Sequence, residues 1–288
     1  MNRLLLPSFS SPEEKRAEIY VISWERYETL ALCLAGLVGF NSGVGPIHVI
    51  DDASTDPRVE HLLARFAARK FLTYEVNESN RGVGVCRRRV VDRFLAGDAE
   101  QLVQVEGDML VAPAAVAALV GAYRRLRASG TEVNWLATHQ HDWCHKTLEV
   151  VSANGYEIGR ARSGSEPFWT TSRDVLQANE GLIPPTRPDL VPFLKCVGAT
   201  VLREPEIQAQ HLGAINSYYY GTYKGGSGKP VFRPDLVTYK NHDGTMRQPY
   251  PWFEIDFARG QEVCERDYLE WAQLLADASP LDMPEITE

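Results

Sequence analysis

Two short acidic segments follow directly on apolar runs that are typical of buried strands. Asp51-Asp52 comes after residues 47–50, and Glu106-Gly107-Asp108 comes after residues 102–105. In an extended segment, residues i and i+2 point the same way, so the carboxylates of Glu106 and Asp108 can face one ion. Such oxygen ligands suit Mg²⁺ or Mn²⁺ bound together with a substrate diphosphate. Either segment alone is also compatible with an acidic turn in water, but the two together at strand ends favour a metal site.

A glycine-rich segment, residues 80–87 (NRGVGVCR), opens a predicted helix. Glycine lets a ligand approach the backbone closely, and a helix N-terminus attracts anions. The segment is not a dinucleotide fingerprint, because Arg87 stands where the third glycine belongs. Residues 225–229 (GGSGK) are not a P-loop either, because Tyr223 and Pro230 occupy positions that require Gly and Ser or Thr.

The elements that must position these residues alternate regularly in the first half of the chain. Apolar runs predict strands at residues 19–23, 47–50, 71–76, 102–105 and 133–138, and helical spacing predicts helices at residues 27–38, 57–69, 82–96 and 113–128. Such repetition predicts an α/β fold with a mostly parallel sheet covered on both faces. Ligands of such sheets bind beyond the carboxyl ends of the strands, where the acidic and glycine-rich segments lie.

The second half is less regular. Residues 147–158 are expected to form a strand or hairpin, residues 187–198 a short helix, residues 216–252 loops and short strands, and residues 261–277 a closing helix.

Composition excludes several classes of protein. The 288 residues are 44% hydrophobic and 24% charged, which excludes disordered, collagen-like and coiled-coil chains. A net charge of −8 argues against coating of nucleic acid by charge alone. The five cysteines are scattered without a C-x-x-C pair, which favours a reduced, cytoplasmic setting. No run approaches the roughly 18 apolar residues of a membrane-spanning helix, so we expect no integral membrane segment.

These segments, in this order, resemble the GT-A glycosyltransferases, and family 2 in particular. Residues 49–56 (VIDDASTD) match the nucleotide-binding V-D-D-G-S-T-D element, and residues 80–87 resemble its N-x-G-x-x-x-A-R element. Residues 105–108 (VEGD) stand where the metal-binding D-x-D belongs, and residues 19–26 (IYVISWER) resemble the opening strand and its polar turn. The resemblance covers residues 18–125 and implies the GT-A, Rossmann-like fold.

The resemblance continues more weakly towards the C-terminus. Residues 188–199 are similar to the helix that carries the catalytic base, which implies that role for Asp189, although Pro188 replaces the family's Glu. His211 lies where many members have a metal-binding histidine. Residues 166–171 (EPFWTT) resemble the acceptor-side segment, in which Trp169 can stack on a sugar or lie in the core.

The resemblance implies a metal-dependent, inverting glycosyltransferase. Its expected cofactor is Mn²⁺ or Mg²⁺, held by Asp108, Glu106 and His211, and its expected donor is a nucleotide sugar, with UDP-sugars favoured. The implied acceptor is a glycan, metabolite, peptide or modified nucleic acid. The implied donor-binding residues are Ser23, Glu25, Asp51, Asp52, Asn80, Gly84, Arg87, Glu106, Gly107 and Asp108. The implied organisation is an extension (1–17), a catalytic domain with a donor half (18–125) and an acceptor half (126–215), and a C-terminal lid and helix (216–288) of the same domain.

Two other functions stay open at this point. A sugar-phosphate nucleotidyltransferase on a related fold would usually carry a glycine- and arginine-rich loop after the first strand, where this chain has residues 23–27 (SWERY). A noncatalytic nucleotide-sugar-binding module would keep the same motifs without turnover. A transition-metal site formed by His139, His141, Cys144 and His145 is a further alternative.

Overall fold

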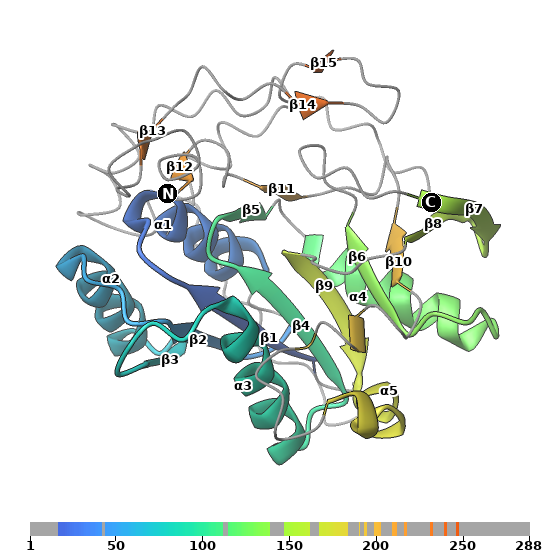
Figure 1. The fold of residues 1–288 in the computed structure, drawn as a ribbon, viewed down its shortest axis with the longest axis horizontal. Coiled ribbons are helices and arrows are strands. Elements are labelled where there is room, and N and C mark those ends of the chain that lie inside the picture. Colours follow the sequence, from blue (N-terminus) through green and yellow to red (C-terminus); the bar gives the residue numbers. More distant parts are fainter. Residues whose placement is uncertain are drawn as a thin grey trace, which may run out of the picture.

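The fold is built on a nine-stranded sheet (Figure 1). The computed structural model describes residues 17–41, 44–111, 115–138, 147–161, 167–183, 190, 193–194, 199–202, 209–211, 216–217, 231–232, 239–240 and 246–247. The strand order is β3-β2-β1-β4-β9-β6-β10-β8-β7. The strands are β1 (Ala17–Ser23), β2 (Ile47–Asp51), β3 (Thr73–Val76), β4 (Gln101–Glu106), β6 (Trp135–Thr138), β7 (Thr147–Ala153), β8 (Tyr156–Ala161), β9 (Phe168–Ser172) and β10 (Ala199–Leu202).

Most of the central strands run in one direction. β3, β2, β1 and β4 are parallel neighbours. β9 is antiparallel to both β4 and β6, so β6 runs in the same direction as β4, and β10 is parallel to β6. The hairpin of β7 and β8 completes the far edge, with β8 antiparallel to β10. This arrangement confirms the predicted mostly parallel α/β sheet.

Strand register sets the ends of three neighbouring strands at one level. Ser23, the last residue of β1, lies opposite Asp51, the last residue of β2. On the other side of β1, Ile22 lies opposite Glu106, the last residue of β4. The two acidic segments therefore flank the carboxyl end of β1, which is the edge where open α/β sheets bind ligands.

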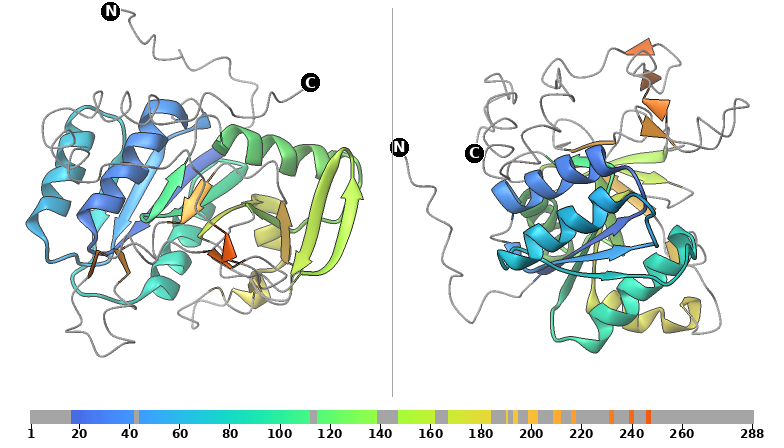
Figure 2. Two further views of the ribbon diagram at one scale, coloured as in Figure 1. Left: turned by 90° about the horizontal axis from the view of Figure 1, so that it is seen from above. Right: turned by 90° about the vertical axis from the view of Figure 1, so that its left-hand side faces the viewer.

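Helices cover both faces of the sheet (Figure 2). The helices α1 (Tyr27–Gly36), α2 (Pro57–Ala68) and α4 (Ala115–Ala128) pack on one face, and a short π-helix, η1 (Leu37–Asn41), continues α1. The helices α3 (Val83–Ala96) and α5 (Arg173–Ala178) pack on the other face, and a 3₁₀ turn, η3 (Glu180–Leu182), follows α5. None of the helices in the described residues is long and apolar enough to cross a membrane.

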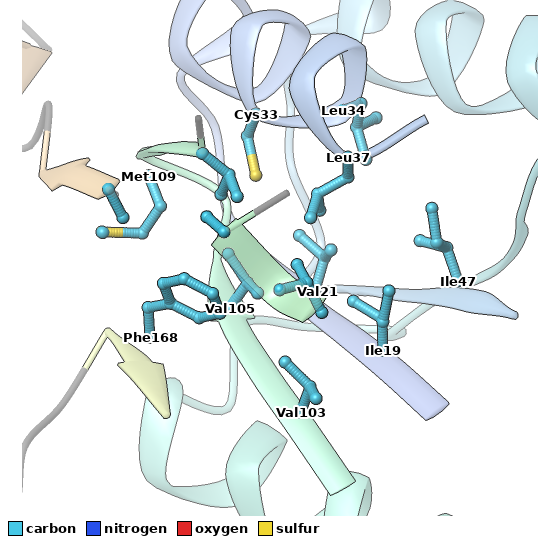
Figure 3. Close-up of a cluster of buried hydrophobic side chains, with 14 of the residues drawn as sticks. Ile19, Val21, Cys33, Leu34, Leu37, Ile47, Val103, Val105, Met109 and Phe168 are labelled. Atoms are coloured by element: carbon cyan, nitrogen blue, oxygen red, sulfur yellow. The ribbon is translucent and has the colours of Figure 1, made fainter. Parts of the chain in front are cut away.

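Alternating side chains of each central strand divide between two cores. On the α1 face, Val103 and Val105 of β4 pack with Ile19 and Val21 of β1 and with Phe168 of β9 (Figure 3). The neighbouring residues Tyr20, Ile22, Leu102 and Trp169 of the same strands belong to the core under α3. Burying each such side chain contributes about 1.5–3 kcal/mol, so this double core fixes the sheet that carries the strand ends.

Short strand pairs lie outside the main sheet. β5 (Met109–Val111) pairs antiparallel with β11 (Ala209–His211), as Figure 1 shows. Two further pairs join β12 (Asn216–Ser217) to β13 (Val231–Phe232) and β14 (Tyr239–Lys240) to β15 (Met246–Arg247).

The structure departs from the predicted elements mainly after residue 138. The four predicted helices of the first half and the hairpin after residue 147 are confirmed. The pattern did not predict β9, because this buried strand shows no alternation of apolar and polar residues. It did not predict the short helix α5 either. Of the predicted helix 187–198, the described residues Leu190, Phe193 and Leu194 are buried in the core under α3, and Phe193 and Leu194 are helical. The predicted closing helix 261–277 lies outside the described residues.

Candidate functional site

Backbone hydrogen bonds hold the neighbouring strand ends together. The N–H of Asp52 donates to the carbonyl of Ser23 over 2.8 Å, and the N–H of Gly107 donates to the carbonyl of Ile22 over 2.8 Å. These bonds continue the sheet just beyond the last strand residues. We call the four carboxylates placed there, Asp51, Asp52, Glu106 and Asp108, the carboxylate edge.

Asp51 is buried, with 1% of its surface exposed, and is bound by neutral donors. One of its oxygens accepts from Ser23 Oγ and from Ser54 Oγ, both over 2.7 Å, and the other accepts from the backbone N–H of Ser54 over 2.8 Å. A buried carboxylate is stable only where donors replace its lost water. Asp51 therefore ties the end of β1 to the loop after β2. Its contact with a nucleotide stays a prediction.

Asp52 is equally buried and fixes the start of α3. It accepts hydrogen bonds from the side chain of Asn77 over 2.8 Å and from the backbone N–H groups of Arg81 and Gly82 over 2.9 and 2.7 Å. Gly82 has a φ of 84°, a conformation that suits glycine, and directly precedes the helix. The exposed Asn80 also accepts from the N–H of Gly82, over 3.1 Å. Gly84, in the first turn of α3, completes the glycine-rich segment that the sequence predicts for the site.

The loop after β1 is held in an unusual conformation by the loop after β2. Glu25 and Arg26 have φ values of 53° and 57°, in the left-handed region that costs a non-glycine residue about 1–3 kcal/mol. The Glu25 carboxylate accepts from the N–H and hydroxyl of Thr55 over 2.7 and 2.8 Å and from the N–H of Asp56 over 3.2 Å. The N–H of Glu25 donates to Ser54 Oγ over 2.6 Å. These bonds fix the backbone from which Arg26 projects.

Asp108 forms an ion pair with Arg26, and both side chains are mostly buried, with 12% and 14% exposed. Close packing brings the two together. A Cβ on Gly107 would lie 3.1 Å from Leu30 Cδ1 and 3.2 Å from the carbonyl oxygen of Ile22, so only glycine lets the turn approach β1 and α1 this closely. This explains the predicted place of Gly107 in the site.

Glu106 forms an ion pair with Arg87, which lies on α3 and is almost fully buried. Asp52 fixes the first residues of the same helix, so the position of Arg87 beside Glu106 depends on Asp52. The four carboxylates are thus connected through the loops after β1, β2 and β3 and through α3. This is the convergence that the sequence predicts, and all the predicted donor-side residues lie on these segments.

The carboxylate edge fits a divalent cation shared with a substrate. Glu106 and Asp108 supply the oxygen donors that Mg²⁺ and Mn²⁺ prefer, and such ions often take one or two carboxylates and complete their coordination with phosphates and water. Among the described residues, no group of three or more His, Cys, Asp or Glu could hold an ion by itself. The described donor set therefore fits a metal–diphosphate complex better than a cage made of protein ligands alone.

Of the two other predicted catalytic residues, His211 and Asp189, the structure describes the backbone of the first. In the β5–β11 pair the backbone of His211 lies opposite Met109, the residue after Asp108. A residue about a hundred positions away thereby comes next to the acidic turn. Asp189 and the cluster His139, His141, Cys144 and His145 lie outside the described residues.

Two buried cysteines lie beneath the carboxylates. Burial, and then the charge of Asp108, raises the pKa of the Cys33 thiol far above its usual range. Burial, and then the charge of Asp52, raises the pKa of Cys86 to about 12. Both are free thiols, and neither forms the thiolate that would act as a nucleophile or metal ligand at neutral pH. These cysteines therefore serve the packing.

The described structure assigns Trp169 to the core. Its side chain is fully buried, its indole N–H donates to Gln104 over 2.8 Å, and its ring meets Trp135 edge to face. Of its two predicted roles, core packing is confirmed. The sequence pattern does not assign site roles to Arg26, Ser54 and Asn77. Arg26 and Ser54 lie inside motif segments, whereas Asn77 has no signal except its place just after β3.

Comparison with solved structures identifies the fold. GalNAc-T7, in a crystal structure with UDP, GalNAc and Mn²⁺, matches with a TM-score of 0.51 and 12% identity, over 93% of this chain and 55% of that chain. TarS of S. aureus, residues 1–349, matches with a TM-score of 0.48 and 14% identity, over 73% of this chain and 62% of that chain. The same TarS fragment in complex with UDP matches with a TM-score of 0.48 and 12% identity, over 68% and 60%.

These comparisons support the fold and leave the activity to be tested. No family model and no curated protein matches the sequence. The chain spans less than two thirds of the length of the solved chains it matches. The similarity to GalNAc-T7 confirms that the chain has the GT-A fold of glycosyltransferases.

Proposed function

We propose that this chain is a metal-dependent glycosyltransferase that transfers a sugar from a nucleotide-diphosphate sugar to a hydroxyl group, with inversion at the anomeric carbon. The observation that carries the proposal is the carboxylate edge, in which Glu106 and Asp108 meet two arginines at the ligand-binding edge of a GT-A sheet. A UDP-sugar is the favoured donor, because the GalNAc-T7 structure holds UDP with Mn²⁺.

The donor would bind across the ends of β1, β2 and β4. Asp108, Glu106 and His211 would hold Mn²⁺ or Mg²⁺, which when bound supplies Lewis-acid stabilisation of the charge on the departing diphosphate. Arg87 brings positive charge to the same place. Asp51, Asp52 and Glu25 position the loops that receive the nucleotide, together with Ser23, Asn80 and Gly84.

Proton transfer would be the task of Asp189. In the proposed reaction its carboxylate takes the proton of the acceptor hydroxyl while that oxygen attacks the anomeric carbon. Direct displacement of the diphosphate inverts that carbon. We expect Asp189→Ala to bind the donor normally and to stop transfer, whereas equal loss of binding and transfer would contradict the assignment.

A donor screen tests the proposal. Thermal unfolding is followed with UDP, GDP, ADP and their sugar derivatives, each with Mn²⁺ or with EDTA. A ligand at a hundred times its Kd stabilises a protein by about 2.7 kcal/mol, so a specific donor should raise the Tm in the presence of Mn²⁺. Stabilisation by none of these ligands would contradict the proposal. Release of pyrophosphate from a nucleoside triphosphate and a sugar phosphate would instead identify a nucleotidyltransferase.

A second experiment identifies the acceptor. Incubation with the stabilising donor and with glycans, metabolites, peptides or modified nucleic acids, followed by mass spectrometry, would detect a gain of one sugar mass. Donor binding without transfer to any acceptor and without donor hydrolysis would favour a noncatalytic binding module.

A further inference from the structure

We propose that Arg26 is a positioning residue that occupies the metal-binding carboxylate Asp108 until the donor arrives, so that the divalent cation and the donor diphosphate bind cooperatively. The inference rests on the proposed function, because it assigns a cation to Asp108 and a diphosphate to the carboxylate edge. It adds a coupling between the two ligands and names the side chain that produces it.

Arg26 and a divalent cation compete for the same carboxylate. The guanidinium pairs with one oxygen of the Asp108 carboxylate, in a place where each side chain has less than a sixth of its surface exposed. Among the described contacts, this ion pair is the one that the Arg26 guanidinium makes. A cation that binds Asp108 must therefore displace Arg26 or share the carboxylate with it.

Displacement alone is costly for Arg26. A mostly buried guanidinium that loses its partner keeps its charge without water or a counter-ion to compensate for it. A diphosphate removes this cost, because arginine binds phosphate oxygens through two parallel N–H groups. The donor would thus provide ligands to the cation and a new partner to the arginine at the same time, and each ligand would favour binding of the other.

The backbone supports a change of partner by the side chain alone. Glu25 is bonded to Thr55, Asp56 and Ser54, so the chain immediately before Arg26 is held firmly. After Arg26, its carbonyl accepts from the N–H of Leu30 in the first turn of α1 over 3.0 Å. Arg87 is a weaker candidate for such exchange, because it projects from the second turn of α3 and is only 6% exposed.

Direct measurement of Mn²⁺ binding tests the inference without relying on activity. The full chain and its Arg26→Gln variant are titrated with Mn²⁺ without nucleotide, with free Mn²⁺ followed by electron paramagnetic resonance. We expect the variant to bind Mn²⁺ about tenfold more tightly, because coupling between two sites typically changes affinity 5- to 150-fold. We also expect it to bind UDP about tenfold more weakly at saturating Mn²⁺, by the same coupling.

Three further variants control the measurement. Arg93→Gln removes an equal charge from an exposed ion pair with Glu75 and should change neither affinity. Adding Asp108→Asn to Arg26→Gln should abolish the gain in Mn²⁺ affinity. Arg26→Lys keeps a positive charge beside Asp108 but lacks the paired N–H groups of arginine, so it should bind Mn²⁺ normally and UDP more weakly. This variant replaces Arg26→Gln in the test if Arg26→Gln does not fold.

The outcomes separate this inference from the proposed function. Equal Mn²⁺ affinity in the parent and in Arg26→Gln, or no Mn²⁺ binding to either, would overturn the inference even if UDP binds. Tighter Mn²⁺ binding without weaker UDP binding would overturn the role of Arg26 on the diphosphate. Failure of every nucleotide to bind the parent protein would contradict the proposed function, whatever the Mn²⁺ titrations show.

Discussion

The two acidic pairs at the carboxylate edge have similar positions and opposite surroundings. Asp51 and Asp52, at the end of β2, are bound by hydroxyls, an amide and backbone N–H groups, all of them neutral. Glu106 and Asp108, at the end of β4, are each bound by an arginine. The first pair is almost inaccessible to solvent, whereas the side chains of the second pair keep 22% and 12% exposed.

This difference separates two uses of the same chemical group. Asp51 and Asp52 each accept from backbone N–H groups, which cannot leave their acceptor without unfolding the loop, so both residues serve to fix the loops. An arginine on a long side chain can be exchanged for another cation, so Glu106 and Asp108 remain open to a ligand. Variants of the first pair should therefore fail mainly in stability, whereas variants of the second pair should also lose ligand binding.

The largest effect is expected for Asp108→Asn. Removing the charge should lower the affinity for Mn²⁺ at least about a hundredfold, because it replaces an anionic ligand of a hard cation with a neutral one. The Tm should also fall, because the mostly buried Arg26 loses its counter-ion. Isothermal titration with Mn²⁺ and UDP measures the effect, with Asp98→Asn, an exposed residue before β4, as the charge-matched control. Unchanged Mn²⁺ binding would place the metal site elsewhere.

Asp52→Ala should mainly affect stability. It removes the acceptor of three donors, on Asn77, Arg81 and Gly82, of which the N–H of Gly82 keeps its bond to Asn80. Each unsatisfied buried donor costs about 1–3 kcal/mol. Allowing for partial hydration, we expect a loss of about 3 kcal/mol in the free energy of unfolding, measured with urea. Asp52→Asn keeps one acceptor oxygen and should cost less. A stable Asp52→Ala protein that has lost only nucleotide binding would reverse our division of the two pairs.

Gly107→Ala tests the packing that brings the second pair to β1. The added methyl group would lie 3.1 Å from Leu30 Cδ1 and 3.3 Å from Ser23 Cβ. Overpacking of this kind costs about 1–3 kcal/mol. The Tm should fall and Mn²⁺ binding should weaken together. Gly181→Ala, where a methyl group would meet nothing within 4 Å, is the control and should leave the Tm unchanged.

The smallest effect is expected for Asp56. This acidic residue lies in the loop after β2, is not part of the carboxylate edge, and is bound by Arg58. Asp56 caps α2, and its hydrogen bonds with the Arg58 side chain hold its pKa below the usual value. Asp56→Ala should cost about 1 kcal/mol at pH 7. Because the folded pKa is lowered, this stability is present above the ordinary Asp pKa of about 3.9 and is lost as the pH falls through the folded pKa. Urea unfolding at pH 7 and pH 3 measures the difference, and an equal loss at both pH values would contradict it.

Much of the carboxylate edge could be predicted because its signals are local. An apolar run marks each of β1, β2 and β4, and the acidic residues follow within one or two positions. Parallel strands then bring these ends to one edge without further information. The glycine at position 107 could be predicted as part of the motif, but its reason, the close approach to Leu30 and Ile22, is visible only in three dimensions.

The rest could not be predicted because it depends on contacts between distant residues. The pairing of Arg26 with Asp108 spans 82 positions, and that of Gln104 with Trp169 spans 65. The strand β9 is buried on both faces, so the Phe-Trp-Thr-Thr run carries no period that distinguishes it from a loop segment. Its antiparallel place between β4 and β6 follows from the chain path and not from its composition.

The antiparallel direction of β9 affects which part of the carboxylate edge can change by substitution. Because β9 runs against its neighbours, the chain enters it at the edge where β4 ends, and the carbonyl of Pro167 accepts from the N–H of Glu106 over 2.7 Å. A substitution of Pro167 would therefore change the surroundings of Glu106, while β1, β2 and the hydrogen bonds of Asp51 and Asp52 stay as they are. Under the proposed function, such a change would alter the metal-binding carboxylates and leave the loop after β2 intact.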